Sequence, residues 1–278
     1  NNAAVLQTCL NSMLLRDHTN AAARDGITKN VNAGEITTFD SLDTSLIKPA
    51  FSGRLAVRNW ACYLALNAMF SQVGYAADAA TCQTMAAVTA ATIVNRWNAY
   101  QATLGYLPAL LNGSVTAATT PMIEGLAYPA AMGLTNAIDR TGGPYAAMLQ
   151  ALSNHLVAVL VPGRCLDTVT GAWLSTSANQ ITWQSKIFIA QYAAEAVLGI
   201  TKNTVNGDVD QIHASVQIQG ASYQGYCDAF FANGALHGGY HYPRGITTSL
   251  WWLNATNNPS NPVATAAPGA PTLSFALA

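Results

Sequence analysis

The sequence of 278 residues contains the stretch Val57-Arg-Asn-Trp-Ala-Cys-Tyr-Leu-Ala-Leu-Asn-Ala-Met69, in which apolar side chains recur at helical spacing. One face holds Val57, Trp60, Ala61, Leu64 and Ala68. Much of the other side is also apolar, with Cys62, Leu66 and Met69. We therefore expect this segment to form a helix that is buried nearly all round.

The same periodicity predicts further helices along the chain, whereas the alternation typical of strands is scarce. The expected helices cover residues 5–16, 82–93, 145–156 and 183–198, and a shorter one follows Pro243 and carries Leu253. Polar connections of unequal length, at 30–49, 105–121, 162–182 and 201–240, separate these helices. This organisation favours an all-α fold of the (α/α)6 toroid type over residues 1–253, followed by an extended Pro/Ala/Thr-rich tail over 254–278.

The chain carries few charges and has almost no net charge. Only 9% of its residues are charged, against about 25% in an average protein, and the formal net charge is −1. A neutral surface provides no long-range field that would attract nucleic acid or an acidic membrane. The composition therefore favours a neutral substrate such as a sugar.

Cysteines and glycosylation sequons bear on where the protein works. The five cysteines are far apart and form no C-x-x-C pair, so their disulfide pairing stays open. Asn112-Gly-Ser and Asn254-Ala-Thr match the acceptor pattern for N-glycosylation. Together with a lysine-poor surface, they favour a secreted glycoprotein.

The densest acidic cluster is Glu35-Ile-Thr-Thr-Phe-Asp40-Ser-Leu-Asp43, in a chain with three glutamates and ten aspartates. Asp40 or Asp43 can simply cap the next helix. Alternatively, one carboxyl lies in a dry pocket, where burial raises its pKa enough for it to donate a proton to a leaving oxygen.

The residues 35–46, EITTFDSLDTSL, closely resemble the signature of family 52 glycoside hydrolases, which are β-xylosidases. Further segments resemble blocks of this family in the same order, among them 9–18, 91–94, 105–109, 121–126, 173–177, 183–187 and 242–251. The resemblance implies that Asp40 is the catalytic acid/base, and a similar T-Y-D arrangement in the more distant family 116 β-glucosidases supports Asp40 over Asp43. It also implies the C-terminal part of a retaining catalytic domain.

A retaining mechanism needs a second carboxylate about 5 Å from the acid/base. The family's nucleophilic glutamate precedes the acid/base, and Glu35, Glu124 and Glu195 do not resemble its block. We therefore expect an additional, N-terminal segment or chain to carry the nucleophile.

Other residues are candidate ligands of the sugar. Glu124, in an apolar turn, makes either a structural ion pair or a hydrogen bond to a sugar hydroxyl. Trp183 and Lys186 are either core residues or residues of the sugar pocket. Arg244 either anchors a helix or donates bidentate hydrogen bonds to two sugar hydroxyls. We also expect Asp43 to bind substrate.

The leading hypothesis is a cofactor-free exo-glycosidase that removes terminal β-xylose from xylo-oligosaccharides. A non-catalytic carbohydrate-binding module on the same scaffold and a glycosidase for another sugar are the alternatives, and a homo-oligomer stays open. His237 and His241 are four residues apart, but Gly238-Gly239 between them argues against a helical metal pair.

Overall fold

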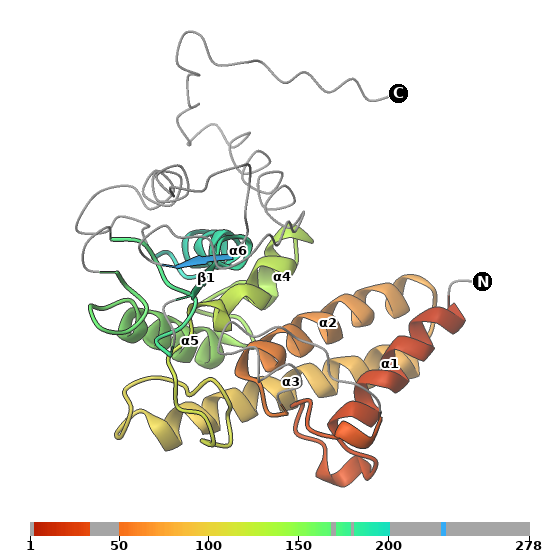
Figure 1. Cartoon of the computed structure of the whole chain (residues 1–278). Coiled ribbons are helices and arrows are strands. Elements are labelled where there is room, and N and C mark those ends of the chain that lie inside the picture. Colours follow the sequence, from red (N-terminus) through yellow and green to blue (C-terminus); the bar gives the residue numbers. More distant parts are fainter. Residues whose placement is uncertain (1–2, 34–49, 168–170, 179–180, 201–228, 232–278) are drawn as a thin grey trace, which may run out of the picture.

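The computed structural model describes residues 3–33, 50–167, 171–178, 181–200 and 229–231. Within this part of the chain, helix predominates (Figure 1). The α-helices are α1 (Ala3–Asp17), α2 (Gly53–Gln72), α3 (Ala76–Tyr100), α4 (Ala127–Ala131), α5 (Ala146–Val159) and α6 (Gln184–Ala196). The 3-10 helices are η1 (Ala21–Ala23), η2 (Val31–Ala33), η4 (Thr120–Leu126) and η5 (Thr135–Ile138). The strands are β1 (Ile181–Trp183) and β2 (Ala229–Phe231).

Helix α2 begins where Ser52 caps it. The Ser52 hydroxyl accepts a hydrogen bond from the backbone N–H of Leu55 at 3.3 Å, which satisfies one of the amides at the helix start. On the predicted apolar face Val57, Trp60 and Ala61 are buried, whereas Leu64 and Ala68 are partly exposed. The expectation of burial nearly all round is wrong, because Cys62 is exposed and Met69 keeps 44% of its surface in solvent.

The helices α2 and α3 make the most extensive contact between described elements. The chain reverses between them at Gly74, whose φ of +80° lies in the region that favours glycine. Helix α1 packs on α2, and α5 packs on α3. Around Trp60 the contact is specific, because its ring meets the ring of Tyr145 edge-on, with centroids 5.3 Å apart and planes at 84°.

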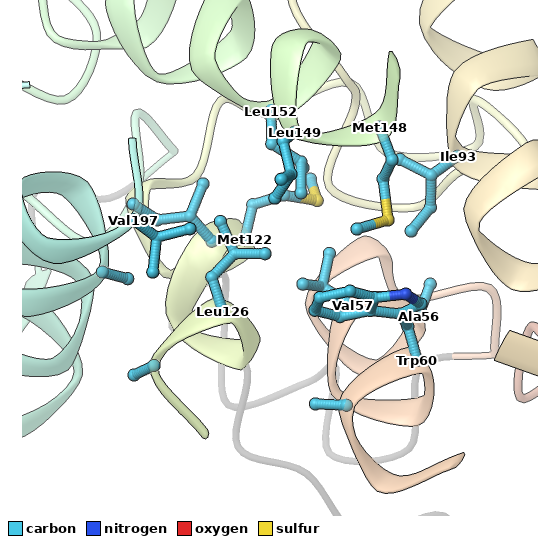
Figure 2. Close-up of a cluster of buried hydrophobic side chains, with 14 of the residues drawn as sticks. Ala56, Val57, Trp60, Ile93, Met122, Leu126, Met148, Leu149, Leu152 and Val197 are labelled. Carbon is cyan, nitrogen blue, oxygen red and sulfur yellow. The ribbon is translucent and has the colours of Figure 1, made fainter. Parts of the chain in front are cut away.

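The short helix η4 lies against both α2 and α6 and connects these parts of the core. Figure 2 shows Met122 and Leu126 of η4 in the apolar cluster, together with Val57 of α2 and Leu149 of α5. All seven residues of η4 are buried. This segment therefore belongs to the core, although it lies between long helices in the sequence.

The predicted start of the helix over residues 183–198 is wrong at Trp183. The periodicity places Trp183 inside a helix, whereas the structure places it in β1, directly before α6. There it is the Cα partner of Ala229 in an antiparallel pair between β1 and β2. The partner strand lies far along the chain, so local periodicity could not reveal the pairing.

The expectation of an all-α fold is confirmed, since the described residues are mostly helical and the one sheet consists of two three-residue strands. The toroid and the domain boundary at residue 253 stay predictions. The helix expected after Pro243 and the tail over 254–278 lie outside the described residues. None of the helices in the described part is long and apolar enough to cross a membrane.

Candidate functional site

The position of Glu124 follows from the way η4 approaches α2. A Cβ atom on the adjacent Gly125 would lie only 2.7 Å from the backbone carbon of Val57, so only glycine permits this approach. The two arginines of α2, Arg54 and Arg58, are four residues apart and therefore share a helix face. Glu124 faces this pair.

Both arginines contact the same oxygen of Glu124. The Nε and Nη2 atoms of Arg54 lie 2.8 and 2.6 Å from Oε1. The Nε atom of Arg58 lies 2.6 Å from Oε1, in ion-pair contact but without hydrogen-bond geometry. The other oxygen, Oε2, is buried without a hydrogen-bond partner. Glu124 therefore makes the structural ion pair, and one of its oxygens is left with acceptor capacity.

The environment of Glu124 keeps it ionised. Burial opposes ionisation and raises the pKa of this carboxyl, but the positive charges of Arg54, Arg58 and Lys186 and the hydrogen bond from Arg54 outweigh it, so that the pKa is lowered. The side chain of Glu124 is fully buried and that of Arg58 is a quarter exposed. Charges in such a dry setting interact strongly because little water screens them.

Lys186 and Trp183 complete the group that we call the Glu124 cluster: Arg54, Arg58, Glu124, Trp183 and Lys186. Lys186 is fully buried on α6, and its Nζ lies 5.0 Å from the ring centroid of Trp183, within range of a cation–π interaction. Trp183 is 6% exposed, and its backbone N–H donates to the hydroxyl of Ser175 at 2.9 Å. The structure thus brings together three residues that the sequence selected separately.

The Glu124 cluster offers the groups that a neutral polyhydroxyl ligand needs. A carboxylate oxygen accepts a hydrogen bond from a hydroxyl, and ammonium and guanidinium groups donate to one. The indole ring of Trp183 supplies an apolar face. Chemically, the cluster can hold and orient hydroxyl groups.

Four further predicted residues lie outside the described part of the chain: Asp40, Asp43, Arg244 and Asn254. The predicted glycosylation residue Asn112 is exposed on a turn, and its Oδ1 accepts hydrogen bonds from the backbone N–H and the hydroxyl of Ser114, at 3.1 and 2.7 Å. In the described residues, no three His, Cys, Asp or Glu side chains are grouped so as to hold a metal ion. His237 and His241 lie outside them.

Sequence reasoning missed Arg54 and Arg58, although a signal was present. They are two of the eight arginines and stand four apart on an otherwise apolar helix. A glutamate in an apolar turn needs a buried cationic partner. Searching for an arginine pair at helical spacing would have found them.

A second buried polar residue that the sequence did not reveal is His155. Its Nδ1 accepts a hydrogen bond from the backbone N–H of Leu107 at 3.1 Å, so the proton is on Nε2, which donates to the carbonyl of Thr119 at 2.9 Å. Burial lowers its pKa to about 4, against the weaker opposing effect of the Thr119 hydrogen bond. The neutral ring fastens the segment before η4 to α5 and so helps to position Glu124.

Comparison with known proteins finds similarity to a protein of the kind that the sequence motifs predict. The chain matches no protein-family model. It is similar to a protein of Geobacillus stearothermophilus named β-xylosidase, with 35% identity over 254 residues, which make up 89% of this chain and 35% of that protein. The chain thus spans about a third of the length of that relative. The resemblance to β-xylosidases that the motifs predict is therefore confirmed over most of the chain.

Proposed function

We propose that this chain is the acid/base-bearing part of a retaining, exo-acting β-xylosidase that removes terminal β-xylose from xylo-oligosaccharides. The observation that carries the proposal is the 35% identity to a protein named β-xylosidase over 89% of the chain. The near-zero net charge is consistent with a neutral sugar substrate.

In this proposal Asp40 is the general acid and base. Protonated, it donates its proton to the glycosidic oxygen as the bond to the leaving group breaks. Once the leaving group has left, the Asp40 carboxylate takes a proton from the water that hydrolyses the glycosyl-enzyme intermediate. These two roles of one carboxyl group are characteristic of retaining glycosidases.

The nucleophile is proposed to lie on an N-terminal segment or chain beyond these 278 residues. A nucleophilic carboxylate must have its oxygens available to the anomeric carbon. Glu124 is a poor candidate because its segment does not resemble the family's nucleophile block and because Arg54 and Arg58 hold its Oε1 in an ion pair. Glu195 is exposed on α6, away from any dry pocket among the described elements.

The Glu124 cluster is proposed to form part of the sugar pocket, together with Asp43 and Arg244. Support comes from the buried, unpartnered Oε2 of Glu124, which a sugar hydroxyl can satisfy. The positive charge of Lys186 contributes to the lowered pKa of Glu124, so the two groups belong to one electrostatic environment.

The acid/base assignment is tested by the dependence on the leaving group. Asp40→Ala in the intact protein that contains this chain should slow aryl β-xylosides with poor leaving groups by about 10²- to 10⁴-fold, because only these need protonation. Substrates with activated leaving groups should lose far less. Asp43→Ala is the matched control. Equal losses of activity on both kinds of substrate, or a larger loss in Asp43→Ala than in Asp40→Ala, would show that Asp40 is not the acid/base.

The sugar specificity requires its own test. A panel of nitrophenyl glycosides should show the β-xyloside as the preferred substrate. Faster turnover of another glycoside would point to a related glycosidase. Binding of xylose units without any turnover would support a non-catalytic module instead.

We also propose that the protein is secreted and glycosylated at Asn112 and Asn254. The exposure of Asn112 on a turn supports this for the first acceptor. Expression in a secretory eukaryotic host should give a mass increase that an endoglycosidase removes and that Ser114→Ala reduces. An unchanged mass would exclude the modification at Asn112.

A further inference from the structure

A cavity of about 600 Å³ lies between the end of α1, the segment that follows it and the start of α2. Its lining includes Asp17, His18, Lys29, Asn32 and Phe51. The volume is within the range of small-ligand sites. None of these residues belongs to the Glu124 cluster.

Hydrogen bonds within the protein hold the wall of this cavity in place. The buried carboxylate of Asp17 accepts from the backbone N–H of Gly26 and from Lys29 Nζ, both at 2.6 Å. Lys29 also contacts Asp25 at 2.5 Å. The amide of Asn30 donates to the carbonyl of Leu15 at 2.8 Å and accepts from the backbone N–H of Asn32 at 3.2 Å. The wall is therefore already ordered without a ligand.

Phe51 is held on this wall by a strained backbone. Its φ of 67° is positive, and it is the one non-glycine residue with positive φ in the described part of the chain. For a bulky side chain this conformation is unfavourable. Backbone hydrogen bonds keep it there, from Phe51 N–H to the carbonyl of Thr28 at 2.9 Å and from Leu111 N–H to the Phe51 carbonyl at 2.8 Å. Such strain is concentrated at functional sites, and here it holds a residue that lines the cavity and also packs against the core.

Several polar groups on the wall have unused hydrogen-bonding capacity. The Nδ1 atom of His18 accepts from the backbone N–H of Asn20 at 2.9 Å, which leaves the proton on Nε2 as a donor. The side-chain amide of Asn32 and the hydroxyl of Thr19 are exposed and make no hydrogen bond among the described residues. The cavity thus combines one aromatic face with donors and acceptors of neutral type.

The local charge selects the class of ligand. Lys29 lies between two carboxylates, Asp17 and Asp25, and the guanidinium of Arg24 donates to the carbonyl of His18 at 3.0 Å, so these four charges cancel and favour neither an anion nor a cation. The Lys29 ammonium already occupies the position between the two carboxylates that a metal cation would take. A wholly apolar ligand would bury the free groups of His18 and Asn32 without partners. A neutral molecule with hydroxyls around an apolar ring face meets all these conditions.

From these observations we infer that the cavity is a second carbohydrate site, in which a sugar ring packs on Phe51 and its hydroxyls bind His18, Thr19 and Asn32. In the sequence, Asn32 and Phe51 flank the segment that contains Asp40. In this inference the bound sugar is a unit of the xylo-oligosaccharide. That choice of sugar rests on the proposed function, whereas the binding itself can be measured separately.

The test is calorimetric titration of the intact protein with xylohexaose, in an Asp40→Asn background so that the sugar is not consumed. Phe51→Gly removes the ring and suits the positive φ, so the fold should be kept, as checked by the unfolding temperature. We expect it to weaken xylohexaose binding at least tenfold, while Phe51→Tyr stays within about threefold of the parent. As a matched control, Tyr75→Ala removes an exposed aromatic ring at the other end of α2, about 30 Å away along the helix, and should leave the affinity unchanged.

The outcomes separate this inference from the proposed function. Unchanged xylohexaose affinity in folded Phe51→Gly, or no binding by the parent, overturns the second site even if aryl xylosides are hydrolysed. Loss of affinity in Phe51→Gly supports the site even if the unsubstituted protein hydrolyses no xyloside, in which case only the proposed function fails.

Discussion

At the scale of single residues, Glu124 carries the largest electrostatic consequence. It neutralises part of the charge of two arginines in a dry setting, and removing its charge leaves them buried without compensation. Glu124→Gln should therefore lower the free energy of unfolding by about 3 kcal/mol, the lower end of the usual range because Arg58 stays partly in water. Urea unfolding measures this directly.

The matched control is Glu195→Gln, which changes the same functional group at an exposed position on α6. It should alter the free energy of unfolding by less than about 0.5 kcal/mol. Equal effects of the two substitutions would show that the buried ion pair contributes nothing particular to stability.

The sequence predicted that Glu124 needs a partner or a ligand, but it could not say which. The partners come from a helix some 70 residues earlier in the chain, and the fold alone brings them within 2.6 Å. Trp183 and Lys186 were each predicted as possible pocket residues, and their proximity to Glu124 comes from tertiary packing that no local pattern encodes. The candidates Asp40, Asp43 and Arg244 stay predictions.

His155 makes stability depend on pH. In the folded protein burial lowers its pKa to about 4, whereas an unfolded histidine has a pKa of about 6.5. Between these values the unfolded chain binds the proton and the folded one does not, so stability falls as the pH decreases. From pH 7 to pH 4.5 the loss from this residue should be about 2 kcal/mol.

Denaturant titrations of the parent and of His155→Leu at the two pH values measure this contribution. The variant should be less stable at pH 7, because the N–H of Leu107 and the carbonyl of Thr119 lose their partner, but it should lose less stability on acidification. An identical pH dependence in both proteins would rule out His155 as its source.

At the scale of elements, the contact between η4 and α2 depends on the absence of one side chain. Gly125→Ala places a methyl group 2.7 Å from the backbone of Val57, where no flexible side chain can give way. We expect a loss of about 1–3 kcal/mol in the free energy of unfolding, as in other overpacked cores. Gly142→Ala, where a Cβ meets only the carboxylate of Asp139 at 3.3 Å, should stay within about 0.5 kcal/mol.

Apolar periodicity located most of the described long helices, because the segments that bury an apolar face do so by helix packing. It failed at the two points where a distant element decides the outcome. Trp183 forms a strand because residues 229–231 pair with it, and Cys62 and Met69 are exposed although they continue the apolar pattern of α2. The helix η4 escaped notice because its seven residues are too few for a periodic pattern.

At the scale of the whole molecule, the proposed function places the nucleophilic carboxylate on an N-terminal segment or chain. If that proposal holds, a preparation of this chain whose intact mass shows no accompanying polypeptide should fail to hydrolyse aryl β-xylosides. Adding the proposed nucleophile-bearing segment should restore turnover. Full activity of the chain alone would overturn the argument from the missing nucleophile.

If the intact protein is a retaining β-xylosidase, as we propose, the anomeric configuration of the first product will show it. Proton NMR during hydrolysis of an aryl β-xyloside distinguishes the anomers of xylose before they equilibrate. The account predicts that β-xylose appears first and α-xylose only later, by mutarotation, because two successive displacements retain the configuration. Initial release of α-xylose, or no release of xylose by the intact protein, would contradict it.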